Sequence, residues 1–376
     1  MYVALGSAMI LVPNCSSSHI SASGQDDGGL HANGGTGGTF SSGSASGRDA
    51  GLGAGGTAVG GTVGAGRIDD ASAGGGTGLT ITEFDIPSPN SRPNDIVAGP
   101  DGNLWFTEFA SNTGNKIAYV TTEGAFTEFP IPTNASEPMG IAVGPDGNLW
   151  FAEYQGNQIG RITPTGVITE YPVPTLGGGP VCIASGPDGN LWFTENTLFR
   201  VGRVDLSGVI TEFQLPTIAA EALGIAAAPD GNLWFTESKA AKIGRISPAG
   251  AITEFEIPTL QSRPDKIVVG PDGNLWFTEE TADKIGRVTT AGVFTEYPIP
   301  TAAAMAVGIA LGPDGNIWFT EMAADVGKIG HITPAGTITE FSLPTPSSGP
   351  ENIVAGPDGN LWFTENSASK IGRISL

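Results

Sequence analysis

Residues 187–195 read PDGNLWFTE, and this phrase or a close variant occurs seven times along the chain. Each copy carries one tryptophan, and together these are all the tryptophans of the protein, at Trp105, Trp150, Trp192, Trp234, Trp276, Trp318 and Trp362. Their spacings are 45, 42, 42, 42, 42 and 44 residues. A period near 42 with one tryptophan per unit is typical of a radial array of four-stranded sheets. The repeats predict an all-β fold, a seven-bladed β-propeller.

One repeat supplies the strands of one blade. In the unit that begins at Gly140, a short apolar run leads into the turn GPDGN, and three further strand-like stretches follow, LWFAE, QIGRI and VITEYPVP. The Asp-Gly pair provides the positive-φ turn that joins antiparallel strands. The last unit ends at KIGRISL and lacks its ITEF strand, whereas ITEFDI at Ile81–Ile86 precedes the first PDGN. We therefore expect the N-terminal strand to complete the last blade and close the ring.

The sequence before the repeats predicts two further segments. Residues 1–15 contain a short apolar stretch, Tyr2–Val12, followed by Cys15, which resembles a signal or lipoprotein leader with Cys15 as the lipid acceptor. Residues 16–78 are mainly Gly, Ser, Ala and Thr and predict a disordered linker. The propeller then occupies residues 79–376. This organisation predicts an exported protein, in the cell envelope or outside the cell, with an optional lipid anchor.

Charge and cysteine content exclude several classes of function. The formal net charge is −21, which disfavours a nucleic-acid partner because phosphates would be repelled. No apolar run is long enough to span a bilayer. Cys182 is the only cysteine within the repeats, so no disulfide forms inside the propeller, and the CxxC and HExxH zinc patterns are absent. A closed ring leaves little free strand edge, which favours a monomer.

Each WFTE-type strand ends in a glutamate: Glu108, Glu153, Glu195, Glu237, Glu279, Glu321 and Glu365. In most units a basic residue begins the next strand, as Lys242 does after Glu237. One interpretation is a cross-strand ion pair in each blade. The alternative is a ring of carboxylates that binds a cation at the mouth of the channel.

Function in a propeller is expected where the copies differ, at the start of each inner strand on the channel. Four blades carry apolar or small pairs there: Met139 and Gly140, Val181 and Cys182, Leu223 and Gly224, Val307 and Gly308. Three carry polar pairs: Asn94 and Asp95, Asp265 and Lys266, Glu351 and Asn352. Arg92 and Arg263 stand two residues before Asn94 and Asp265. We predict that these polar residues bind a small molecule, a glycan or an envelope protein. The alternative is that they are solvated strand ends.

Repeats such as GPDGNLWFTE at residues 99–108, KIGRISPAG at 242–250 and FTEFPIPT at 126–133 make residues 79–376 resemble the virginiamycin B lyase, or streptogramin lyase, family. The resemblance implies a seven-bladed propeller and Mg²⁺-dependent opening of cyclic streptogramin B esters by elimination. It also implies two essential histidines and a glutamate at positions that are here Val307, Glu351 and Gly349. None of the three is retained, and the only histidine in the repeats, His331, replaces the arginine of a different strand.

Two functional hypotheses follow. The first is a binding module that has lost the family's chemistry. The second is a carbon–oxygen lyase with a rearranged site, in which Glu351 is the general base and Asp95, Asp265 and Glu351 hold Mg²⁺. A calcium-dependent lactonase on a related propeller is a third possibility, for which the sequence offers no assignable ligand set.

Overall fold

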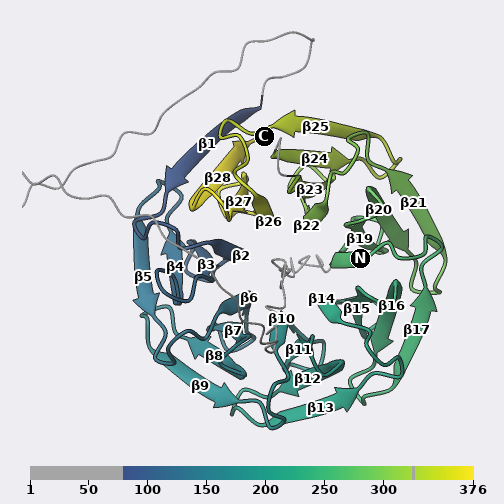
Figure 1. Ribbon diagram of the computed structural model, residues 1–376, viewed down its shortest axis with the longest axis horizontal. Coiled ribbons are helices and arrows are strands. Elements are labelled where there is room, and N and C mark those ends of the chain that lie inside the picture. The colour runs from purple at the N-terminus through teal and green to yellow at the C-terminus, as the bar shows by residue number, and fades with distance from the viewer. Residues whose placement is uncertain (1–78, 324–326) are drawn as a thin grey trace, which may run out of the picture. The chain divides into compact units, whose positions relative to one another are not determined.

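The computed structural model describes residues 79–323 and 327–376. They form 28 strands in seven four-stranded antiparallel sheets, which are arranged as blades around a central axis (Figure 1). The predicted all-β fold and seven blades are confirmed. The predicted leader, its Cys15 and the predicted linker lie outside the described residues. In the described ranges no helix is long and apolar enough to cross a membrane.

The strands fall into four classes by their distance from the axis. The inner strands are β2 (Pro93–Ala98), β6 (Pro138–Val143), β10 (Pro180–Ser185), β14 (Ala222–Ala227), β18 (Pro264–Val269), β22 (Ala306–Leu311) and β26 (Pro350–Ala355). The second strands carry the WFTE motif and are β3 (Leu104–Glu108), β7 (Leu149–Glu153), β11 (Leu191–Glu195), β15 (Leu233–Glu237), β19 (Leu275–Glu279), β23 (Ile317–Glu321) and β27 (Leu361–Glu365).

The third strands are β4 (Lys116–Val120), β8 (Gln158–Ile162), β12 (Arg200–Val204), β16 (Lys242–Ile246), β20 (Lys284–Val288), β24 (Lys328–Ile332) and β28 (Lys370–Ser375). The outer strands are β1 (Thr80–Asp85), β5 (Phe126–Pro130), β9 (Ile168–Pro172), β13 (Ile210–Gln214), β17 (Ile252–Glu256), β21 (Phe294–Pro298) and β25 (Ile338–Ser342). Inner strands begin, and second strands end, on what we call the upper face. The GPDGN turns and the turns after the third strands form the lower face.

The GPDGN turn fixes both the strand reversal and the position of the tryptophan. In the second blade Gly147 adopts φ 74°, and the amide of Gly144 donates to the carbonyl of Asn148 at 2.8 Å. The carboxylate of Asp146 accepts hydrogen bonds from Asn148 and from Nε1 of Trp150, the latter at 3.1 Å. The aspartate thus satisfies the one polar atom of a fully buried indole.

The core lies between adjacent blades and repeats with them. All seven tryptophans are at most 1% exposed, and each stacks on an aromatic ring of its outer strand, as Trp234 does on Phe255 at a centroid distance of 5.3 Å. The arginine of the third strand covers the same pair, with Arg245 at 5.6 Å from the Trp234 ring centre. A β-carbon at Gly244 would lie 2.1 Å from Phe235, so the glycine of IGR leaves room for that ring, as expected.

The ring closes through the N-terminal strand, as predicted. The last sheet has the order β1-β28-β27-β26, with Thr80 opposite Ser375 and Asp85 opposite Lys370 (Figure 1). Phe84 of β1 stacks on Trp362 at 5.5 Å, and Glu83 pairs with Lys370 at 3.0 Å. The inner strand β26 also contacts β2 of the first blade. The first and last parts of the propeller are therefore joined at both the axis and the rim.

Candidate functional site on the upper face

A β-bulge displays the variable pair at the start of every inner strand. In the first blade Pro93 pairs with Glu108 and Ile96 with Phe106, so Asn94 and Asp95 together face the single residue Thr107. The same register shift occurs in all seven blades. Bulges redirect side chains and are frequent next to binding sites. The positions where the sequences of the blades diverge are thus the positions where the backbone departs from regular pairing.

In six of the seven blades the threonine of WFTE holds the bulge against the next blade. Thr364 accepts from the amide of Asn352 at 3.0 Å and donates to the carbonyl of Asn94, in the first blade, at 2.8 Å. Equivalent bridges run from Thr107, Thr194, Thr236, Thr278 and Thr320. The second blade has Ala152 at this position and makes no such bridge. The backbone under the variable residues is therefore fixed by repeated hydrogen bonds, independently of the residue displayed.

The polar pairs of the first and last blades come together, because ring closure makes these two blades neighbours. Nδ2 of Asn94 lies 3.5 Å from Oε1 of Glu351, a long hydrogen bond. Nδ2 of Asn352 donates to Oδ1 of Asp95. All four side chains are at most 1% exposed. Within the described ranges Oδ1 of Asn94 has no hydrogen-bond partner, although it is buried. A buried acceptor without a partner lowers the stability of the fold. A hydrogen-bond donor from a ligand would remove this cost.

Asp95 is also held by the neighbouring blade. Its Oδ1 accepts from the amide of Ile96, and its Oδ2 accepts from the amide of Ile141 in the second blade, both at 2.9 Å. Burial raises the pKa of Asp95 to about 6, while the positive charge of Lys266 and these hydrogen bonds act to lower it. Lys266 itself is buried, with Nζ 4.0 Å from Sγ of Cys182. The fifth blade thus contributes its charge to the same cluster.

The two predicted arginines lie at the edge of this cluster and are exposed. Nε of Arg92 donates to Oδ1 of Asn366 at 3.3 Å, and its guanidinium stands over the ring of Phe109 at 5.6 Å. Nε of Arg263 lies 3.7 Å from a carboxylate oxygen of Glu280. The partners Phe109, Glu280 and Asn366 were missed by sequence reasoning. Each directly follows a WFTE glutamate, a position that varies between blades and could have identified them.

The predicted metal set does not form a metal centre. Among the described residues no group of three or more His, Cys, Asp or Glu side chains is arranged to hold a metal ion. Asp95, one of the three predicted ligands, has N–H donors on both carboxylate oxygens and faces the positive charge of Lys266. A carboxylate that accepts three N–H hydrogen bonds and faces a cation is poorly suited to Mg²⁺, which needs free oxygen ligands. The residues present do not fit the family's metal.

The glutamates of WFTE do not make the predicted ion pairs. Glu237 and Lys242 are paired in backbone register, but the ammonium of Lys242 lies 3.0 Å from Glu254 of the outer strand. Corresponding bridges join Lys116 to Glu128, Lys284 to Glu296, Lys328 to Glu340 and Lys370 to Glu83. The lysine pairs with the outer-strand glutamate and not with the WFTE glutamate opposite it, because the outer-strand carboxylate is partly exposed and the WFTE carboxylate is buried.

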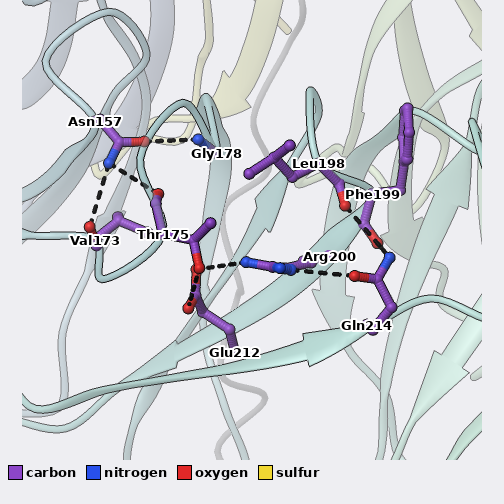
Figure 2. Close-up of polar contacts among 9 residues, drawn as sticks. All are labelled: Asn157, Val173, Thr175, Gly178, Leu198, Phe199, Arg200, Glu212 and Gln214. Atoms are coloured by element: carbon purple, nitrogen blue, oxygen red, sulfur yellow. Dashed lines mark hydrogen bonds and ion pairs between the residues drawn. The ribbon is translucent and has the colours of Figure 1, made fainter.

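Figure 2 shows the same arrangement in the third blade, where arginine replaces lysine. Nη1 of Arg200 donates to Glu212 at 3.2 Å, and Nε donates to Gln214 at 3.2 Å. Thr175, on the connection that enters this blade, donates to the other oxygen of Glu212 at 2.8 Å (Figure 2). Asn157 fastens the same connection through the amide of Gly178 at 2.8 Å. These contacts attach each crossing loop to its blade.

The seven WFTE carboxyl groups are fully buried, and in the described part of the chain none of their oxygens has a hydrogen-bond donor. Burial and the nearby outer-strand carboxylate raise the pKa of Glu237 to about 8. The pKa values of the other six are raised to about 7 or 8 in the same way. Six of them are therefore largely protonated at neutral pH, whereas Glu279, with a pKa of about 7, is only partly protonated. No group of the seven is arranged to hold a cation.

His331 packs against aromatic rings in the sixth blade. It occupies the arginine position of the sixth blade and packs against Trp318 with the rings tilted, at a centroid distance of 4.8 Å. Burial lowers its pKa, so the ring is neutral at physiological pH. It lies on β24, in the blade interior, and takes no part in the upper-face cluster.

Two similar solved structures are both streptogramin-type lyases. A streptogramin B lyase structure matches with 38% identity over 79% of this chain and 98% of that chain, at a TM-score of 0.75. A catalytically inactive virginiamycin B lyase from Staphylococcus aureus with quinupristin matches at 37% identity, 79% and 99% coverage and a TM-score of 0.75. The WD40 propeller domain of Doa1, at 12% identity and a TM-score of 0.62, shares the fold alone. No curated protein matches significantly.

The sequence model of the virginiamycin B lyase family matches residues 61–279 and 259–376, which together include every blade. Two overlapping matches on one chain are expected of a repeat architecture, because either half can align with the other. By this match and by its likeness to the lyase structures, the chain belongs to the virginiamycin B lyase family.

Proposed function

We propose that this chain is a ligand-binding member of the virginiamycin B lyase family that does not perform the family's elimination chemistry. The ligand is a small peptide-like molecule, which binds on the upper face where the first and last blades meet. The observation that carries the proposal is Oδ1 of Asn94, a buried acceptor with no partner in the described ranges, beside the carboxylate of Glu351. A ligand N–H or O–H would satisfy this oxygen.

The choice of a peptide-like ligand rests on the relatives and on the chemistry of the seam. One similar structure holds quinupristin, and that protein and this chain match over nearly the whole propeller. Around the seam lie amides, a carboxylate, the guanidinium of Arg92 and the ring of Phe109. This mixture of hydrogen-bonding groups with an aromatic surface suits a molecule that has both peptide groups and rings.

The proposal that elimination is absent rests on the groups at the expected catalytic positions. Proton removal next to an ester carbonyl needs a base, and the family resemblance places one at Val307, which cannot accept a proton. Gly349 has no side chain to support a second base at Glu351. The fit of the residues to Mg²⁺ is also poor, because the carboxylate of Asp95 already accepts three N–H hydrogen bonds.

The test uses the full chain with quinupristin, with and without Mg²⁺. Isothermal titration calorimetry measures binding, and liquid chromatography with mass spectrometry separates the ring-opened isomer, which has the same mass. We expect binding without ring opening, and loss of binding in Asn94→Ala. The matched control is Asn148→Ala, a half-buried asparagine in a lower-face turn. Absence of binding by the folded protein would contradict the proposal.

The second candidate function is a lyase that uses Glu351 as the base. It is favoured by the carboxylate at the position of a family histidine and by the hydrogen bond that orients it toward Asn94. If quinupristin is opened, Glu351→Gln should abolish turnover and leave the thermal midpoint unchanged. Glu221→Gln, a partly exposed glutamate on the same face, is the control. Turnover retained in Glu351→Gln would remove this assignment.

Export is a separate proposal, which rests on the sequence of residues 1–15 alone. We expect the protein in the envelope fraction of the producing cell and, if Cys15 is lipidated, in its membrane pellet. Cys15→Ser should then move the protein to the soluble exported fraction. Recovery of the unchanged chain from the cytoplasm would contradict export.

A further inference from the structure

A second site lies at the lower face, at the opposite end of the inner strands. A cavity of about 900 Å³ opens there around the axis. The last residue of every inner strand contributes to its wall, and six of these seven are apolar: Ala98, Val143, Ala227, Val269, Leu311 and Ala355. All six are half-buried, so their side chains form the accessible surface of the wall. Asn94 is about 13 Å from Ala98 along β2, at roughly 3.3 Å per residue.

The wall offers almost no hydrogen-bonding capacity. The seventh inner strand ends in Ser185, whose hydroxyl already donates to the carbonyl of Val143 at 2.6 Å. The amides of Gly99 and Gly144, at the rim, donate to Asn103 and Asn148 within their own turns. Water in such a space makes fewer hydrogen bonds than in bulk, so replacing it with an apolar molecule is favourable.

The surroundings select against anions. Each GPDGN turn places an aspartate on the lower face, outside the cavity: Asp101, Asp146, Asp188, Asp230, Asp272, Asp314 and Asp358. Burial acts to raise the pKa of Asp146, but hydrogen bonds from Asn148 and Trp150 outweigh it and leave that pKa below its usual value. The pKa values of Asp188 and Asp272 are lowered similarly. These three aspartates are therefore ionised, and Arg203 and Arg287 lie 3.9 Å and 3.5 Å from Asp188 and Asp272. The chain as a whole has a net charge of −21, which disfavours anionic ligands.

We propose that the lower-face cavity binds an uncharged apolar small molecule, independently of the upper-face site. Its volume lies in the range of ligand pockets, roughly 300–1,000 Å³, and six of the seven strand ends in its wall are apolar. The sevenfold arrangement provides one wall residue from each blade, so no single blade creates the site. Specificity arises from the exclusion of charge and of groups that need hydrogen bonds.

The test compares two fluorescent probes that differ by one sulfonate. N-Phenyl-1-naphthylamine is uncharged, and 8-anilinonaphthalene-1-sulfonate is its anionic counterpart. We expect the full chain to enhance the fluorescence of the uncharged probe at least tenfold more strongly than that of the sulfonate at equal concentration. Equal enhancement by the two probes would overturn the inferred selectivity, and no enhancement of the uncharged probe would overturn the site.

Substitutions locate the binding. Ala227→Arg places a charged side chain in the wall and should weaken binding of the uncharged probe at least tenfold. The matched control is Ala249→Arg, an exposed alanine in the lower-face turn of the same blade, which should bind like the wild type. If Ala227→Arg fails to fold by circular dichroism, Ala98→Arg and Ala355→Arg make the same change in other blades. Unchanged binding in a folded wall variant would overturn the proposal.

Discussion

Nδ2 of Asn352, in the last blade, donates a hydrogen bond to Oδ1 of Asp95, in the first blade, across 257 positions of sequence. The same aspartate accepts from the amide of Ile141 in the second blade. Asp95 therefore ties three consecutive blades together at the axis. The candidate ligand site and the inner seam of the ring share these residues, so substitutions there need a stability measurement beside any binding measurement.

Asp95→Ala should destabilise the propeller. The change removes the carboxylate that accepts hydrogen bonds from Asn352, Ile96 and Ile141. These buried N–H groups then lose that acceptor. We expect a loss of about 2–4 kcal/mol in the free energy of unfolding, measured by urea denaturation. Cys182→Ala, at the equivalent bulge of the third blade, should cost about 1 kcal/mol. A loss no greater than that of the control would show that the seam network is dispensable.

Stability should fall as the pH rises from about 5 to about 8. The folded-state pKa of Glu237 is raised from 4.5 to about 8, so the folded protein binds a proton that the unfolded chain has released. The stability this group provides is fully present below pH 4.5 and is lost as pH rises through the folded value. Linkage gives an upper limit of about 1.4 kcal/mol per pH unit for each such group.

Glu237→Gln isolates one of these groups. Glutamine resembles the protonated acid, so the variant should lose less stability than the wild type between pH 6 and pH 9, measured by thermal unfolding. Glu256→Gln, an exposed glutamate on the neighbouring outer strand, should keep the wild-type pH slope. An identical slope in Glu237→Gln would show that this carboxyl group is already ionised in the folded protein.

Phe84→Ala should cost more than the same change in another blade. Phe84 stacks on Trp362 at 5.5 Å and anchors β1, whereas Phe213 makes the equivalent stack on Trp192 at 5.4 Å within a continuous blade. Each substitution loses ring packing worth about 2–3 kcal/mol for a half-buried phenylalanine. In Phe84→Ala the loosened β1 also exposes the edge of β28. We expect a lower urea midpoint for Phe84→Ala, and equal midpoints would contradict a special role in closure.

The sequence predicted the parts of the fold that repeat. The tryptophan period gave the number of blades, and the displaced ITEF strand gave the closure, because both depend on local patterns. The meeting of Asn94 with Glu351 was also predictable, since closure makes their blades neighbours. The ion-pair partners of the lysines on the third strands could not be predicted. Register places Lys242 opposite Glu237, but the ion pair depends on which carboxylate is solvated, and burial is not visible in one sequence.

The lower-face cavity was also beyond the sequence. In the sequence, the residues of its wall resemble the ends of any apolar strand. The small side chains of Ala98, Ala227 and Ala355 line a cavity only because seven strands surround one axis. The unpartnered oxygen of Asn94 likewise depends on a 3.5 Å contact between side chains from opposite ends of the chain. Such features follow from the spacing of neighbours, which a repeat pattern does not specify.

The pairing of β1 with β28 has a consequence for how this protein is made. A ribosome synthesises β1 before all other strands of the propeller and β28 after them. During synthesis of the six other blades, β1 therefore has no partner strand. Those blades can form as they appear, because each takes all its strands from consecutive sequence. Closure is thus reserved for the finished chain, and a chain interrupted before its last blade retains an unmatched strand that quality-control proteases can recognise.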